Sequence, residues 1–129
     1  MKAREAACGV LNDVSAEARM VTVLIIDGDP MVRLTAAGVL ANAGCLVLCV
    51  HSRQDAFRYL SSIKADLAIC DITEKEILRD ICSADPDISV LNMIRKDEPL
   101  FRADSNALRK PFTASELLNA VRRCLARRG

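Results

Sequence analysis

The sequence predicts an α/β domain in which a parallel sheet is covered by helices on both faces. Short, continuous apolar runs alternate with segments of helical periodicity along a chain of 129 residues, which is enough for one domain. The runs lack polar alternation, which is typical of strands that are buried on both faces. Because crossovers between parallel strands are right-handed, the alternation favours a doubly wound sheet.

The composition supports one folded domain with an aliphatic core. Hydrophobic residues make up 51% of the chain and aromatic residues only 3%, so Leu, Ile, Val and Ala must fill the interior. The net charge of +1 argues against a general polyanion binder. Arg122, Arg123, Arg127 and Arg128 crowd the C-terminus. We interpret them as offsetting the negative end of a helix rather than as a nucleic-acid patch.

The cysteines indicate a reduced protein rather than a disulfide scaffold. The chain has six, and no pair has C-x-x-C spacing. Cys45, Cys49 and Cys70 lie within apolar runs, where cysteine behaves as a small hydrophobe. No stretch approaches membrane-spanning length, and the N-terminus lacks the apolar run of a signal peptide. We therefore expect a cytoplasmic protein.

The first elements are expected to be an N-terminal extension and a buried strand. Residues 1–20 are rich in Ala and charge, which suits either a helix or a loose extension. The domain itself is expected over residues 21–129. It opens with Val21–Ile26, an apolar, β-branched run of strand length.

A helix, a second strand and a second helix are predicted to follow. Asp29 has the features of an N-cap, with Pro30 in the first turn. The helix that they open is expected to run to Gly44, a suitable C-cap. Cys45–Val50 is the second expected strand, and Gln54–Leu60 the second helix.

Three further strands and a helix are predicted in the second half. Asp66–Cys70 is a short apolar strand, and Glu74–Ser83 has a helical apolar face. The turn signal at residues 85–87 introduces a strand over Ile88–Ile94. Asn106–Arg109 is the fifth candidate.

The last helix has the clearest start signal. Thr113 and Glu116 form the capping box Thr-x-x-Glu ahead of a helical apolar pattern. Between the fourth and fifth strands, residues 95–105 contain Pro99 and must also make two turns. We expect at most a helix of one or two turns there.

Three ionisable residues follow the predicted strands. Asp27 follows the first strand, Asp71 the third and Lys110 the fifth. In doubly wound sheets the ligand site lies beyond the carboxyl ends of the strands. Two carboxylates on neighbouring strands repel each other unless a cation lies between them, which suits Mg²⁺, and a lysine from a farther strand would add a second positive charge. Taken singly, Asp27 and Asp71 are better explained as polar residues that end buried strands.

Two motifs add a resemblance to a known family. "VLIIDGDPMVR" (residues 23–33) and "RKPFTASELLNAV" (residues 109–121) resemble the opening strand and the Lys-Pro-Phe region of response-regulator receiver domains in two-component signalling. The resemblance covers about residues 21–127. It implies a flavodoxin-like, CheY-like sheet of five strands in the order 2-1-3-4-5.

The resemblance also implies roles for individual residues. Asp71 would be the phosphoryl acceptor, and Lys110 would pair with it. Asp27 and the backbone carbonyl of Thr73 would complete a Mg²⁺ site with Asp71. A sensor histidine kinase or phosphotransfer protein would be the phosphoryl donor. A downstream partner or a second copy would dock on the fifth strand and the last helix.

The sequence departs from the family pattern around this site. Gly28 stands where a second acidic residue is usual, so Mg²⁺ binding is expected to be weak or absent. Ile94 replaces a hydroxyl residue that grips the phosphoryl group, and the bulky Arg95 follows it. Ala107 replaces an aromatic residue on the fifth strand. With so few residues in 95–105, the family's fourth helix is expected to be short or missing.

These departures favour an atypical receiver that acts as an interaction module, with phosphorylation of Asp71 impaired or absent. A conventional Mg²⁺-dependent phospho-acceptor is the alternative, and neither hypothesis makes the chain an enzyme. A remote alternative is a haloacid-dehalogenase-like phosphatase, in which Asp27 is the nucleophile, Asp29 the acid/base and Ser52 the hydroxyl residue. Nucleic-acid binding is not favoured, because no helix-turn-helix pattern follows the last helix.

Overall fold

Five parallel strands form one sheet in the order β2-β1-β3-β4-β5, as the sequence predicted. The computed structural model describes residues 20–71, 75–97 and 106–126. Every strand begins one residue later than predicted, although the residue before a strand can still bond to its neighbour. Val21, for example, accepts from Leu46 N through its carbonyl (2.9 Å). The strands are β1 (Thr22–Ile26), β2 (Leu46–Val50), β3 (Leu67–Asp71), β4 (Ser89–Ile94) and β5 (Ala107–Arg109).

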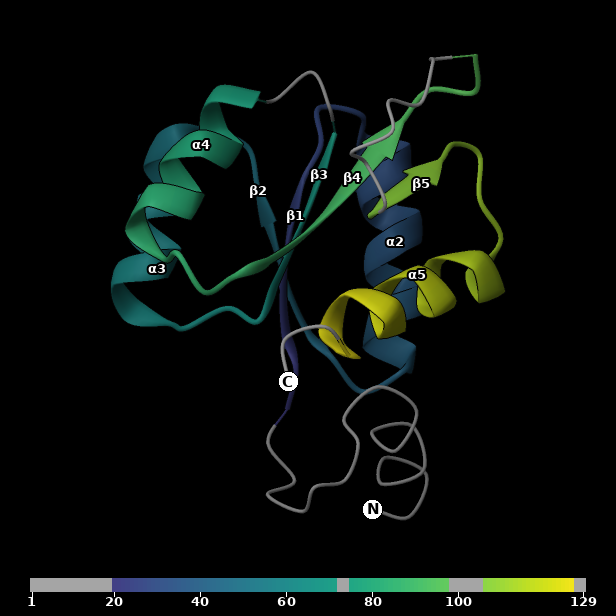
Figure 1. Ribbon diagram of the computed structural model, residues 1–129, viewed down its shortest axis with the longest axis horizontal. Coiled ribbons are helices and arrows are strands. Elements are labelled where there is room, and N and C mark those ends of the chain that lie inside the picture. Colours follow the sequence, from purple (N-terminus) through teal and green to yellow (C-terminus); the bar gives the residue numbers. More distant parts are fainter. Residues whose placement is uncertain (1–19, 72–74, 98–105, 127–129) are drawn as a thin grey trace.

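Two pairs of helices cover the two faces of the sheet (Figure 1). Helices α2 and α5 lie on one face, and α3 and α4 lie on the other. Within the described residues, no helix is long and apolar enough to cross a bilayer. The helices are α2 (Pro30–Asn42), α3 (Arg53–Ser62), α4 (Lys75–Ala84) and α5 (Ala114–Ala126).

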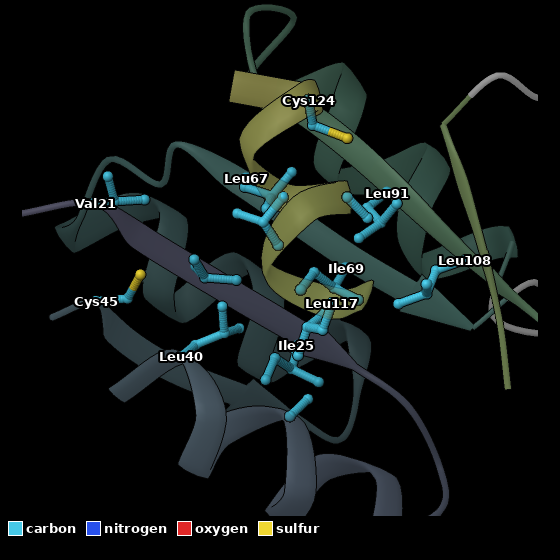
Figure 2. Close-up of a cluster of buried hydrophobic side chains, with 14 of the residues drawn as sticks. Val21, Ile25, Leu40, Cys45, Leu67, Ile69, Leu91, Leu108, Leu117 and Cys124 are labelled. Carbon is cyan, nitrogen blue, oxygen red and sulfur yellow. The ribbon is translucent and has the colours of Figure 1, made fainter. Parts of the chain in front are cut away.

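Alternate residues of the central strand β1 face two separate apolar cores. Val23 and Ile25 pack with residues of α2 and α5 in the larger core (Figure 2). Leu24 and Ile26 pack with residues of α3 and α4 in the smaller core. All four are no more than 1% exposed, which explains why this strand reads as an unbroken apolar run.

The predicted helix caps form, with small shifts in the helix ends. Asp29 Oδ1 accepts from Met31 N (2.9 Å), which confirms it as the N-cap of α2. That helix ends at Asn42 with Ala43 as its C-cap, and Gly44 follows with a φ of 93°, a conformation that favours glycine. Ser52 caps α3, so this helix begins at Arg53, one residue before the predicted start.

The capping box at the start of α5 is also confirmed. Thr113 N donates to Glu116 Oε1 (2.8 Å), and Glu116 N donates to Thr113 Oγ1 (3.1 Å). Helix α4 ends at Ala84 instead of Ser83. Three predictions fall partly or wholly outside the described residues: the extension at 1–20, the Thr73 carbonyl and the shortened helix within 95–105.

Candidate functional site

Asp27 lies at the carboxyl end of the sheet, directly after β1, and is almost fully buried. Its side chain is 2% exposed, and both carboxylate oxygens are hydrogen-bonded. Oδ1 accepts from Asp29 N (2.8 Å), and Oδ2 accepts from Lys110 Nζ (2.9 Å). The Asp27 carbonyl accepts from Arg33 Nη1 (2.7 Å), which ties the turn after β1 to the first turn of α2. Three hydrogen bonds to Asp27 therefore fix the turn between β1 and α2.

Lys110 brings the predicted site residues together. Asp71 is the last residue of β3, one residue further along the strand than predicted. Lys110 follows β5, two strands away from β3. Its ammonium group donates to Asp71 Oδ2 as well as to Asp27 Oδ2. Three side chains that are far apart in sequence thus form one ion cluster, as the strand order predicted.

The cluster is stable because one cation offsets two buried anions. The side chains of Lys110, Asp27 and Asp71 are 19%, 2% and 12% exposed. Burial by itself would lower the pKa of Lys110. The hydrogen bonds to Asp71 and Asp27, together with the two negative charges, outweigh burial and raise its pKa. Lys110 therefore stays protonated, and its positive charge offsets the two carboxylates.

Few side chains among the described residues near the cluster could serve as Mg²⁺ ligands. Gly28 is exposed and offers no side-chain oxygen, and the carboxylate of Asp29 caps α2 instead of turning toward Asp71. Asp27 and Asp71 each already use Oδ2 to bind Lys110. Within the described parts of the chain, no three acidic, His or Cys side chains come close enough to hold a metal ion together. Mg²⁺ prefers near-octahedral oxygen ligation, and these residues supply little of it.

The residues after β4 also differ from a phosphoryl-binding arrangement. Ile94 ends this strand, is 2% exposed and has no side-chain hydrogen-bond donor. Arg95 is exposed, and its carbonyl accepts from Arg109 Nη1 (3.2 Å). Ala107, on β5, pairs with Asn92 and carries no ring that could change its orientation. The hydroxyl and aromatic groups of the family pattern are absent at these positions.

A groove opens beside Lys110. Its volume is about 410 Å³, and apolar residues from α2 and from the turn after β5 line much of it. The cations Arg95 and Lys96 also line it. The apolar members are Met31, Val32, Pro111 and Phe112.

The sequence alone did not single out two residues that the structure makes important. Arg33 lines a second cavity, of about 280 Å³, with Asp27, Gly28 and His51, and binds the Asp27 carbonyl. Its position one helical turn after the Asp29 cap was the available signal. Asp66 is buried at the opposite end of the sheet, where its Oδ2 accepts from Thr22 N (2.8 Å). It has a structural role.

Comparisons with known proteins give matches among solved structures. A response regulator receiver protein from Sinorhizobium medicae WSM419 is 25% identical with a TM-score of 0.72, over 86% of this chain and 98% of that one. A response regulator from Thermotoga maritima is 23% identical with a TM-score of 0.71, over 84% of this chain and 99% of that one. NtrX from Brucella abortus is 19% identical with a TM-score of 0.76, over 85% of this chain and 27% of that one.

No family model and no curated protein matches the sequence. Several of the structures that it resembles are nevertheless response regulators or their receiver domains. The chain has the flavodoxin-like fold of these domains, with five strands in the predicted order. The resemblance that the two motifs indicated is thereby confirmed.

Proposed function

We propose that this chain is an atypical receiver domain of a bacterial two-component phosphorelay. It acts in the cytoplasm as a signalling interaction module, not as an enzyme, and phosphorylation of Asp71 is impaired or absent. Its upstream partner is a sensor histidine kinase or a phosphotransfer protein. A downstream protein or a second copy docks on β5 and α5.

The main support for this proposal is that both oxygens of the Asp27 carboxylate already accept hydrogen bonds. One oxygen is held by Asp29 N at 2.8 Å and the other by Lys110 at 2.9 Å. A metal ion would have to share these oxygens with Asp29 N and the Lys110 ammonium group, at a side chain that is only 2% exposed. Gly28 adds no ligand in compensation, and Ile94 adds no donor for phosphoryl oxygens. The fold supports a receiver, whereas these contacts weigh against phosphoryl chemistry at Asp71.

A conventional phospho-acceptor remains the second candidate because Lys110 contacts Asp71 directly. In that reaction an oxygen of Asp71 forms a bond to phosphorus as the bond from phosphorus to a donor histidine breaks. Lys110 would stay with the anionic oxygens, where a cation is most useful.

The phosphatase alternative requires Asp29 as the acid/base and Ser52 as the hydroxyl residue, and both side chains have other roles in the structure. Asp29 caps α2 and Ser52 caps α3, where its Oγ accepts from Asp55 N (3.1 Å). Both side chains therefore bind backbone N–H groups in the first turn of a helix. We therefore do not propose hydrolysis of phosphate esters by Asp27.

The two receiver hypotheses are separated by adding beryllofluoride with Mg²⁺ and following backbone amide shifts by NMR. We expect no saturable shifts near Asp71 in the wild-type chain. Saturable shifts that disappear in Asp71→Asn would overturn the proposal in favour of a conventional acceptor.

A restored variant provides the matched control. Gly28→Asp with Ile94→Thr returns the acidic residue and the hydroxyl group to the family positions. Gly28 does not have a positive φ, so its backbone conformation is open to other residues. If the missing groups explain the loss of phosphoryl chemistry, this variant will show saturable shifts, and adding Asp71→Asn will abolish them.

A further inference from the structure

Strand β2 is an outer strand of the sheet, and it lacks the residues that usually protect such an edge. It pairs with β1 on one side, and among the described residues no strand pairs with its other side (Figure 1). Outer strands of soluble proteins normally carry a charged residue or a proline. The sequence of β2, Leu-Val-Leu-Cys-Val, contains neither. Leu46 is 40% exposed, and Val47, Leu48 and Cys49 are half-buried.

The pairing with β1 shows which backbone groups of β2 point away from the sheet. Leu46 N donates to Val21 O (2.9 Å), so the backbone groups of Leu46 point toward β1. These directions alternate along a strand, so every second residue after Leu46 also points toward β1. The N–H and C=O groups of Val47 and Cys49 therefore point outward.

The next outward-pointing positions on either side of this pair are already bonded within the chain. Cys45 N donates to Leu40 O (3.0 Å), and His51 N donates to Asp55 Oδ2 (3.4 Å). Within the described part of the chain, the outward groups between them have no hydrogen-bond partner. We call these two residues, Val47 and Cys49, the open edge.

The side chains around the open edge are apolar on both faces of the sheet. Val47 and Cys49 pack against the larger core, and Leu48 packs against the smaller core. An extended segment placed against this edge would pair the outward backbone groups and also remove apolar area from water. The open edge therefore fits an extended strand that carries no charge.

A second copy of β2 meets this description. Two copies related by a twofold axis through Leu48 would run antiparallel, with Val47 opposite Cys49 of the second copy. In this register each N–H group of the open edge faces a C=O group of the other copy. The facing side chains are all apolar, so no like charges meet. The net charge of +1 adds little long-range repulsion.

We propose that the chain forms a dimer in which the β2 strands of two copies pair antiparallel, with Leu48 on the twofold axis. The pairing joins the two five-stranded sheets into one. Strand β5 lies at the opposite edge, so the dimer leaves β5 and α5 free for another partner. Because the paired strands run in opposite directions, the ion clusters around Lys110 lie at opposite ends of the joined sheet. A single strand pair is a small interface, so we expect weak association that depends on protein concentration.

Amide hydrogen exchange of the full chain at low and high protein concentration tests this pairing. In the monomer the amides of Val47 and Cys49 face away from the sheet, whereas those of Leu46 and Leu48 are bonded to β1. We expect exchange at Val47 and Cys49 to slow at least about tenfold at the concentration where sedimentation velocity shows a dimer. Exchange at Leu46 and Leu48 should change much less, which makes these two amides the internal control.

Two substitutions that each add one positive charge separate this edge from the docking surface on α5. Val47→Lys places a lysine at the open edge, where lysine commonly protects outer strands, and should abolish the dimer. Ser115→Lys places the same charge at an exposed position of α5 and should leave the dimer intact. Far-ultraviolet circular dichroism checks that both variants fold.

Cysteine cross-linking tests the register. In the proposed dimer the two Leu48 residues lie directly opposite each other, with Cα atoms about 4.5 Å apart, which a disulfide can span. Leu48→Cys in a Cys49→Ser background should therefore form a disulfide between copies under mild oxidation. The two Cys49 residues of the wild-type dimer are diagonal neighbours about 7–8 Å apart and should not form one.

Three results would overturn the proposal. One is exchange at Val47 and Cys49 that is the same at every protein concentration, whether it is fast or slow. Another is a dimer that survives Val47→Lys and is lost in Ser115→Lys, because the second copy would then dock on α5. The third is a disulfide between the two Cys49 residues of the wild type, which requires a different register.

Discussion

The two ends of strands β1 and β3 both bury aspartates, and the groups that these aspartates contact differ between the ends. At the amino end, Asp66 is 1% exposed and its Oδ2 accepts from Thr22 N (2.8 Å). Its own N–H donates to Thr22 O (2.8 Å). At the carboxyl end, Asp27 and Asp71 converge on the same lysine nitrogen. The same pair of strands therefore buries carboxylates in two different ways.

The difference shows how a structural carboxylate can be told from a candidate functional one. The Asp66 carboxylate accepts from the backbone N–H of Thr22, whose position is fixed by the fold. Asp27 and Asp71 depend on a side chain that arrives from a distant strand. A side chain can move and a bound phosphoryl group or cation can replace it, whereas a backbone donor cannot. Asp27 and Asp71 are therefore the candidates for a response to a ligand.

The largest expected effect is that of removing the cation. Lys110→Met leaves two buried carboxylates facing each other without a counter-charge. We expect the free energy of unfolding to fall by about 3 kcal/mol, the lower end of the range for a broken buried pair, because Lys110 keeps 19% of its side chain exposed. Urea denaturation at pH 7 measures this fall.

A double-mutant cycle and a pH series check the cause. Lys110→Met with Asp71→Asn should recover part of the loss, because one carboxylate charge is removed with its partner. The pKa of Lys110 is raised above its ordinary 10.5, so its contribution is complete below that pH and is lost as the pH rises through the folded-state value. The stability difference between wild type and Lys110→Met should shrink accordingly. A difference that stays constant would contradict a charge-based role.

A smaller effect is expected at the amino end. Asp66→Ala leaves the buried Thr22 N–H without its acceptor, which should lower the free energy of unfolding by about 1–3 kcal/mol. Asp66→Asn keeps a side-chain oxygen and should lower it by less than half as much. Urea denaturation of the two variants separates the contribution of this hydrogen bond to the free energy of unfolding from that of the charge of Asp66. Equal losses in both would mean that the charge of Asp66 matters, and the contrast between the two ends would fail.

The smallest effect is expected at Asp29, which borders the cluster without belonging to it. Its side chain caps α2, so Asp29→Ala should cost about 1 kcal/mol, and Asp29→Ser should cost much less because serine is also a good cap. Thermal denaturation measures both. In the Gly28→Asp, Ile94→Thr background, Asp29→Ser should leave the beryllofluoride response intact. Loss of that response would assign Asp29 to the site.

Local signals in the sequence predicted most of the fold. The continuous apolar run ending at Ile26 marked a strand buried on both faces, and the caps at Asp29 and Thr113 marked helix starts to the residue. Strand starts were predicted one residue early. The short strand at Asn106–Arg109 was the weakest prediction and has only three residues in the sheet.

The candidate site was predictable only as a set of strand-end residues. Asp27, Asp71 and Lys110 were placed at one edge because parallel strands end together. Arg33 and Asp66 were missed because their partners are backbone groups, which leave no residue-type signal in the sequence.

The order of residues determined which segments become strands and helices, and which side chains stand at the strand ends, because hydrophobic periodicity and capping act over a few neighbouring residues. Tertiary structure decided what those side chains do. It directed one lysine to two carboxylates and placed the Asp29 carboxylate at the start of α2. These outcomes depend on distances between residues up to 83 positions apart, and such distances exist only once the chain has folded.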